Sequence, residues 1–299
     1  MLSQCIVLNI LRSVIMIRAD YHVHSSHSGD STEKIDAHIR AALKNNLNYI
    51  CFTDHMDLDY PETPAGHEDE ACDFTLDVST YHADVIKYQK MLLEGRFDCS
   101  LDYDSFNLMY GIEIGLQPQV ATANSEIIKS NNFDFVIGSV HIFDASDPYY
   151  PEFWINRQDS DVYGRYFESI YENICLFDDY DVVGHIDYIF RYGHEKDLNF
   201  KYKDFSDELD SILKKVIESG KGIEINTGGL RAGLKRPNPN PDILKRYKEL
   251  GGEIITIGSD AHVKEHVSLN FDIAESTLKE CGFKYYTVFK NRKPEFISF

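Results

Sequence analysis

The chain has 299 residues, which suits one large α/β domain or two ordinary domains, and its 43% hydrophobic content is enough for a large core. The formal net charge of −19 argues against a nucleic-acid partner, because such proteins concentrate Lys and Arg against the phosphate backbone. A small phosphorylated substrate stays compatible with this charge, since a few Arg or metal ions can reverse the field locally. Six scattered Cys without a Cys-x-x-Cys pair indicate reduced thiols and a cytoplasmic protein.

The first residues are apolar but do not predict a membrane segment. Residues 1–17 carry Gln4, Asn9 and Arg12, are too short to cross a bilayer, and lack a basic start before the apolar part. We therefore expect no membrane partner. We also expect Met16 to be the natural start, with residues 1–15 as an upstream extension and residues 16–299 as a single domain.

Apolar strands alternate with amphipathic helices along the rest of the chain. Strands are expected at 17–23, 49–53, 108–114, 134–140, 181–185, 222–226 and 253–258, with a further strand at 285–289. Helices are expected from Ser31 or Thr32 to 45, from Ser79 to 93, and at 161–177, 205–218, 241–250 and 269–280. The acidic stretch 57–77 is broken by Pro and Gly and has no periodicity, so it predicts a long loop or lid.

Seven apolar strands that alternate with helices predict a parallel sheet, and a closed (β/α) barrel holds them in one domain. An open doubly wound sheet is the alternative. The barrel is favoured because polar residues follow nearly all of the strands, and barrel enzymes build their active sites at the C-terminal strand tips.

His22 and His24 end the first strand and lie two residues apart, so their side chains point to the same face. Imidazoles placed in this way suit zinc, iron or manganese. Other strands end in similar residues, namely Asp54, His55, Glu113, His141, His185, Asp260 and His262. Buried imidazoles and carboxylates are costly unless they are paired or coordinated, so this set predicts a metal centre at one face of the barrel.

The order of these motifs resembles the PHP family of metal-dependent phosphoesterases. The matching pieces are His22-x-His24, Thr53-Asp54-His55, Gly111-Ile-Glu113, Gly138-Ser-Val-His141, Gly184-His185 and Ser259-Asp260-Ala-His262. Within the family the chain is most similar to the histidinol-phosphatases of histidine biosynthesis. That similarity is carried by Asp20-Tyr-His-Val-His24, Gly111-Ile-Glu-Ile-Gly115, Glu224-Ile-Asn-Thr227, Leu230-Arg231 and Ile257-Gly-Ser-Asp-Ala-His262.

The resemblance implies a distorted seven-stranded barrel of the PHP type that holds three divalent transition-metal ions: zinc, iron or manganese. It assigns the ligands to three groups: His22, His24, Glu113 and Asp260; then Asp30, His55 and His262; then Glu113 again with His141 and His185. Many members of the family have a histidine where this chain has Asp30. The carboxylate shifts the preference of that group toward iron or manganese.

The resemblance also implies hydrolysis of a small phosphate monoester, most of all L-histidinol phosphate, by attack of a metal-activated hydroxide. Glu113, Asp260 and His262 would be the catalytic residues. No cysteine nucleophile is expected, because Cys51 and Cys99 lack a matched acidic and basic setting.

Two arginines follow strands at the expected mouth of the barrel. Arg191 comes just after the fifth strand and Arg231 just after the sixth, and a guanidinium can bind phosphate through two hydrogen bonds. We expect both to bind substrate, and His266, four residues beyond His262, to contact it. Arg191 and Arg231 could instead form ordinary surface salt bridges.

The remaining histidines carry no expected role: His38, His67 and His82 are expected on the surface, and His27 and His194 near the mouth. Asp54 is expected to orient His55 or a neighbouring loop rather than to bind metal. Two other functions stay open. The chain could be a PHP phosphoesterase acting on nucleotides, nucleic-acid ends or phosphotyrosine, or a non-catalytic domain stabilised by metal. The oligomeric state is left open.

Overall fold

The structure is a computed structural model, and it describes residues 17–98 and 105–299. The expected extension at 1–15 lies outside these residues. The strands are β1 (Ala19–Val23), β2 (Tyr49–Phe52), β3 (His55–Met56), β4 (Asn107–Gly115), β5 (Phe135–Ser139), β6 (Val182–Val183), β7 (Gly222–Asn226), β8 (Ile255–Gly258), β9 (Tyr285–Lys290) and β10 (Lys293–Ser298). The α-helices are α1 (Ile35–Lys44), α2 (Val78–Leu93), α3 (Ala121–Lys129), α4 (Asp159–Leu176), α5 (Ser206–Glu218), α6 (Gly228–Arg231), α7 (Pro241–Glu249) and α8 (Phe271–Glu280). In the described part of the chain, no helix is both long enough and apolar enough to span a bilayer.

The strands form a parallel barrel, as predicted. Their order is β1-β2-β4-β5-β6-β7-β8, and the short β3 also pairs with β4. The first and last strands meet through a bridge between Val23 and Ala261 and through hydrogen bonds from the Asp260 amide to the His22 carbonyl (2.8 Å) and from the His24 amide to the Ala261 carbonyl (2.9 Å). The barrel is distorted, because β6 is only two residues long and β1 pairs with β2 through an irregular register.

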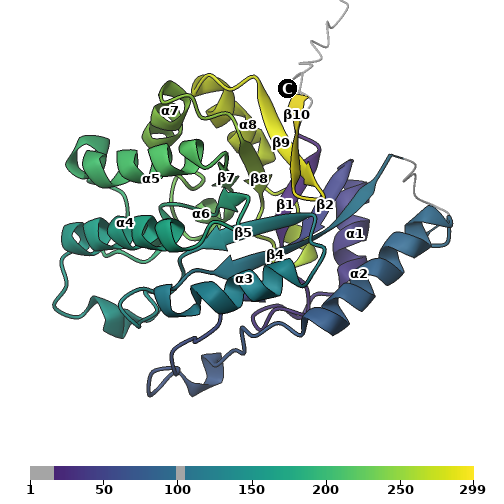
Figure 1. The fold of residues 1–299 in the computed structure, drawn as a ribbon, viewed down its shortest axis with the longest axis horizontal. Helices are drawn as coiled ribbons and strands as arrows, with labels where there is room; N and C mark the ends of the chain where they lie inside the picture. The colour runs from purple at the N-terminus through teal and green to yellow at the C-terminus, as the bar shows by residue number, and fades with distance from the viewer. Residues whose placement is uncertain (1–16, 99–104) are drawn as a thin grey trace, which may run out of the picture.

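Helices pack around the strands because each presents one apolar stripe. Figure 1 shows α4, α5 and α7 on one side of the barrel and α1 and α2 on another. On α5 the buried residues are Leu209, Ile212, Leu213 and Val216, at helical spacing. Strands β1, β5, β7 and β8 are buried along their whole length, as expected of a parallel sheet covered by helices.

The C-terminal strands do not join the barrel. The predicted strand 285–289 is β9, and it pairs antiparallel with β10 in a separate hairpin. Thr287 accepts a hydrogen bond from the Ile255 amide, and Asp134 accepts from the amides of Asn291 and Arg292. Because Asp134 and Ile255 lie where β5 and β8 begin, the hairpin covers the end of the barrel away from the strand tips.

Several predicted boundaries were wrong. Helix α1 starts at Ile35 without a side-chain cap, and the Ser31 hydroxyl lies before it, where it accepts from the Glu33 amide and donates to the carbonyls of His24 and His262. Helix α2 is capped by Asp77 and not by Ser79. The acidic stretch is a long connection, as predicted, but it contains a 3-10 helix at Glu68–Glu70, and the short β3 just before it was not predicted. Helices α3 and α6 were not predicted.

Candidate metal centre and active site

Four side chains meet where β1, β4 and β8 end. His22 Nε2 lies 3.0 Å from Glu113 Oε2 and 3.8 Å from Asp260 Oδ1, and His24 Nε2 lies 3.4 Å and 3.5 Å from the same two oxygens. All four residues are buried. Asp260 reaches the group with its backbone at φ +57°, a conformation that Asp tolerates better than most residues. The structure therefore brings together the four residues of the first expected ligand group.

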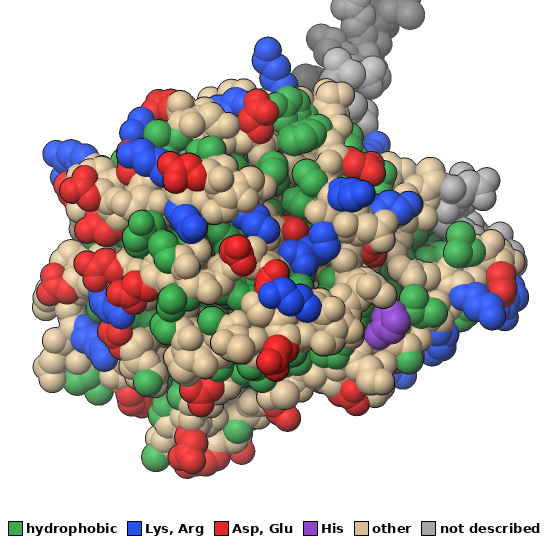
Figure 2. Space-filling model, viewed as in Figure 1, with side chains coloured by type: hydrophobic (Ala, Val, Ile, Leu, Met, Phe, Trp, Pro, Cys, Tyr) green, Lys and Arg blue, Asp and Glu red, His purple; other side chains and the backbone are tan. Residues whose placement is uncertain are grey.

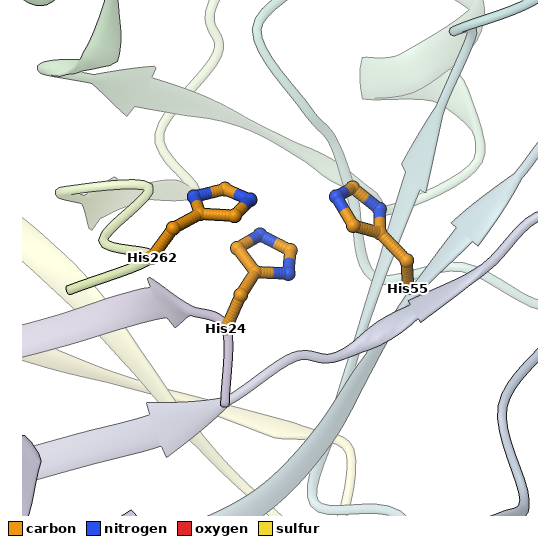
Figure 3. Close-up of side chains that lie close together, drawn as sticks. All are labelled: His24, His55 and His262. Carbon is orange, nitrogen blue, oxygen red and sulfur yellow. The ribbon is translucent and has the colours of Figure 1, made fainter. Parts of the chain in front are cut away.

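The second group lies beside the first, and its two imidazoles, His55 and His262, both face His24 of the first group (Figure 3). The His24 ring stacks on those of His55 and His262, with centroids 4.1 Å and 4.3 Å away. Asp30 Oδ2 is 2.9 Å from His262 Nε2 and 3.7 Å from His55 Nε2. His55 reaches this place through β3, where it pairs with Glu113 in register. The structure thus places Asp30 as the second group requires.

The third group uses the other oxygen of Glu113. Glu113 Oε1 lies 3.0 Å from His185 Nε2 and 3.3 Å from His141 Nε2, and it accepts a 2.6 Å hydrogen bond from the Ser139 hydroxyl. Because Oε2 faces His22 and His24, the Glu113 carboxylate lies between two sets of imidazoles. Burial alone would raise the pKa of Glu113, but the charges of His22, His141 and His55 hold that pKa well below its ordinary value. Glu113 is therefore ionised, as a bridging ligand must be.

Metal binding would change the protonation of the site. Burial lowers the pKa of an imidazole, but the neighbouring carboxylates outweigh it: they raise the pKa of His22, His141 and His262, and they raise that of His55 to about 9, so a metal ion would displace protons from these side chains. Burial and the neighbouring imidazoles of His55 and His262 hold the pKa of His24 well below its usual range, so His24 is neutral, the form that coordinates metal. Burial opposes ionisation of Asp260, yet the charges of His22 and Arg191 hold its pKa well below the ordinary value. Within residues 17–98 and 105–299, the buried atoms His24 Nε2 and His55 Nδ1 have no hydrogen-bond partner. Ligand atoms of several residue triplets lie within 4.8 Å of one another, so the residues fit a cluster of metal ions.

Two carboxylates behind the ligands were not predicted as site residues. Glu224 on β7 lies with Oε1 2.6 Å from His22 Nδ1, and its Oε2 accepts from the His185 amide at 3.0 Å. Asp57 Oδ1 lies 2.8 Å from His141 Nδ1. Such contacts orient a ligand imidazole and fix its tautomer. Glu224 lies two residues before Asn226 at the end of a predicted strand, so the strand-tip pattern could have identified it. Asp57 lies in the acidic stretch, where no periodicity pointed to it.

A glycine makes room for the Glu224 contact. A Cβ atom on Gly258 of β8 would lie 2.2 Å from Glu224 Oε1 and 2.3 Å from His22 Cβ. Asp54 orients a neighbouring loop, as predicted. It accepts hydrogen bonds from the Ser25 amide and from the hydroxyls of Ser25 and Ser28, in the segment that follows His24.

A cavity of about 470 Å³ opens over the three groups. Arg191 and Arg231 both line it, but they differ in their contacts. Arg191 uses all three of its nitrogens: it donates to Asp260 Oδ2 (2.9 Å), Asn226 Oδ1 (3.0 Å) and Asn238 Oδ1 (3.1 Å). Arg231 donates to the Asp260 carbonyl at 2.6 Å, and its buried Nη1 has no hydrogen-bond partner among the described residues. His266 is half-buried and is not among the lining residues.

The other histidines mostly lie as expected. His82 is exposed, His67 is partly exposed beside Glu70, and His27 and His194 pair with Asp84 and Asp159. The prediction for His38 was wrong. It is fully buried against the edge of the Phe52 ring, and burial lowers its pKa to about 4. The sequence pattern could not separate a buried histidine from an exposed one, because both occur on a helix at the same spacing.

Comparison with known proteins agrees with this geometry. The model of the PHP domain matches residues 20–228, which is more than half of the chain. The chain belongs to the PHP family. The "Probable histidinol-phosphatase" of Clostridium acetobutylicum is 32% identical to it over 89% of this chain and 94% of its own length. The histidinol-phosphatase of Lactococcus lactis is 30% identical over 93% and 96% of the two chains.

A solved structure extends the comparison to the fold of this PHP chain. The histidinol phosphate phosphatase of Lactococcus lactis, in complex with zinc, L-histidinol and phosphate, superposes with a TM-score of 0.79 at 28% sequence identity. The superposition covers 93% of this chain and 98% of the other. The predicted PHP-type barrel is thereby confirmed, and so is the resemblance to histidinol-phosphatases.

Proposed function

We propose that this PHP protein hydrolyses a phosphate monoester, and that its substrate is L-histidinol phosphate, which yields L-histidinol and inorganic phosphate. The observation that carries the proposal is the cluster around Glu113, which lies open to a cavity that two arginines line. Structural metal sites are usually closed, whereas catalytic sites keep positions open to substrate. The relatives named for this activity span nearly the whole chain, which supports the choice of substrate.

We assign up to three transition-metal ions to the three ligand groups described above. Zinc is supported by its presence in the Lactococcus lactis structure, and the Asp30 carboxylate favours iron or manganese at the second group. When bound, such ions neutralise phosphoryl oxygens and lower the pKa of water. Glu113 and Asp260 would hold the ions, and His262, which is partly exposed and lines the cavity, would hold an ion on the side that substrate reaches.

The contacts of the two arginines suggest different roles. The free Nη1 of Arg231 is available to bind a phosphoryl oxygen, and the partial burial of this side chain strengthens that contact. Arg191 already donates to three oxygens, so its first role is to hold Asp260 in place. We retain both as substrate-binding residues, because both line the cavity, whereas no contact of His266 with the cavity supports the role expected for it.

The experiment is a phosphate-release screen on protein loaded with zinc, iron or manganese. The panel contains L-histidinol phosphate, sugar phosphates, nucleotides, phosphotyrosine and a 5′-phosphorylated oligonucleotide. We expect the highest kcat/KM for L-histidinol phosphate and loss of release in Glu113→Gln. The surface charges support a small substrate: on the face that Figure 2 shows, basic and acidic side chains are interspersed, and acidic ones gather on the lobe at the bottom of the view. Preference for another panel member would reassign the substrate, and release from none would support a non-catalytic domain.

A further inference from the structure

The cavity over the ligand groups has one wall that phosphate chemistry does not explain. This acidic-aromatic wall consists of Tyr60, Glu70, Asp147, Tyr149, Tyr188 and Tyr192. The Tyr188 ring lies 4.9 Å from the His185 ring, Tyr192 lies 5.1 Å from Tyr188, and Tyr149 lies 5.9 Å from Tyr192. Tyr149 is 50% exposed. A row of rings therefore leads from the third ligand group to the rim of the cavity.

Asp147 is the unusual member of the wall. It is 8% exposed, it accepts hydrogen bonds from the Tyr60 hydroxyl and the Tyr149 amide, and no Lys, Arg or His nitrogen lies within 4.0 Å of its oxygens in the part of the chain that the structure describes. A buried carboxylate without a basic partner is costly. A carboxylate has about four acceptor positions, so two contacts leave room for another donor. The other buried carboxylates that line the cavity each face an imidazole or a guanidinium.

We propose that the acidic-aromatic wall binds a positively charged group of the substrate, so that the site selects phosphate monoesters that carry an ammonium group near the phosphate. Asp147 would accept the charge-assisted hydrogen bond, and the faces of Tyr149 and Tyr192 would supply cation–π contacts. Because Arg231 and the ligand groups attract the phosphate, the cavity would hold a zwitterion with its two charges on different walls. This inference rests on the proposed phosphatase function and adds the feature that selects its substrate.

The first test needs no variant. The metal-loaded protein is assayed with 2-aminoethyl phosphate and with propyl phosphate, which differ in an ammonium group in place of a methyl group. We expect kcat/KM to be at least about tenfold higher for 2-aminoethyl phosphate, since a charge-assisted hydrogen bond exceeds a neutral contact by that amount or more. Equal values for the two esters would overturn the inference.

The second test assigns the preference to Asp147. Asp147→Asn keeps one acceptor oxygen and the size of the side chain but removes the charge. We expect it to raise KM for 2-aminoethyl phosphate about tenfold and to leave propyl phosphate within about twofold. The matched control is Asp144→Asn on the same connection, because Asp144 pairs with Arg165 and does not line the cavity. A loss of equal size for both esters would give Asp147 a merely structural role, and no change for either would remove it from the site.

The failure of this inference is distinguishable from the failure of the proposed function. If the protein released phosphate from none of the esters, calorimetric titration with 2-aminoethyl phosphate and propyl phosphate would still measure the preference. Tighter binding of the ammonium ester, lost in Asp147→Asn, would support the wall even in a protein without turnover. Release of phosphate from both esters at equal rates would keep the function and overturn the wall.

Discussion

Replacing Glu224 by Gln should weaken metal binding, although the side chain faces away from the Glu113 side of the site. Glu224 is buried, and every contact that it makes is as an acceptor: from His22 Nδ1, from the His185 amide and from Asn226 Nδ2 at 3.1 Å. An amide offers one acceptor end and one donor end, so it cannot satisfy this set. If the NH2 group of the introduced amide faces the His185 amide and Asn226 Nδ2, a donor points at each of these two donors and their hydrogen bonds are lost.

The other orientation of the introduced amide damages the ligand directly. With its NH2 group toward His22 Nδ1, that nitrogen must accept, and the ring proton moves to Nε2, the atom that faces Glu113 and Asp260. A protonated Nε2 cannot coordinate metal. Removal of such an outer partner typically lowers metal affinity by about 10–100-fold, which corresponds to about 1.4–2.7 kcal/mol. We expect Glu224→Gln to fall in this range for the most weakly held ion.

Competition with a chromophoric chelator measures that affinity in the folded protein. The control is Asp181→Asn, which also alters a buried carboxylate that accepts from a backbone amide, that of Val136, but at the start of β6 and away from the tips. Asp181→Asn should lower the melting temperature and leave the metal affinity unchanged. Wild-type metal affinity in Glu224→Gln would refute the reasoning, because it would mean that His22 keeps its tautomer without the carboxylate.

Metal content, Arg231 and Gly258 each provide a further test of the site. Protein purified without chelator should contain between two and three transition-metal ions per chain by elemental analysis, and a metal-free preparation with full activity would contradict this. Arg231→Ala should lower kcat/KM about a hundredfold with unchanged metal content, and Arg231→Lys should restore it only in part; normal kinetics in Arg231→Ala would leave the phosphate to the metal ions and Arg191. Gly258→Ala should cost about 1–3 kcal/mol of stability, because its Cβ would lie 2.2 Å from Glu224 Oε1, and a wild-type melting temperature would show that β8 can shift.

The sequence was sufficient to predict the barrel because its strands are buried on both faces and read as apolar runs. The strand tips followed from the same pattern, and the structure brings together His22, Glu113 and Asp260, which come from β1, β4 and just after β8. Alternation along β1 placed His22 and His24 on one face without any knowledge of the fold.

What could not be predicted depends on contacts between distant segments. The Ser31 hydroxyl bonds to the carbonyl of His262, 231 residues away along the chain, and α1 starts four residues after Ser31. Two of the three partners of Arg191, Asn238 and Asp260, lie outside the strands and helices, where no periodicity brings them together. Asp147 lies in a connection between a strand and a helix, where residue spacing does not tell which way a side chain points. Such features depend on side-chain geometry that only the folded chain defines.

The closure of the barrel has a consequence for protein synthesis. His22 and His24 leave the ribosome early, whereas Asp260, whose amide bonds to the His22 carbonyl, is made near the end. A nascent chain therefore holds an incomplete first ligand group until almost all of it has been translated. Chains that terminate early or are cut before β8 keep only part of the ligand set and would bind metal weakly. Tight metal binding would thus be confined to full-length chains in which the barrel has closed.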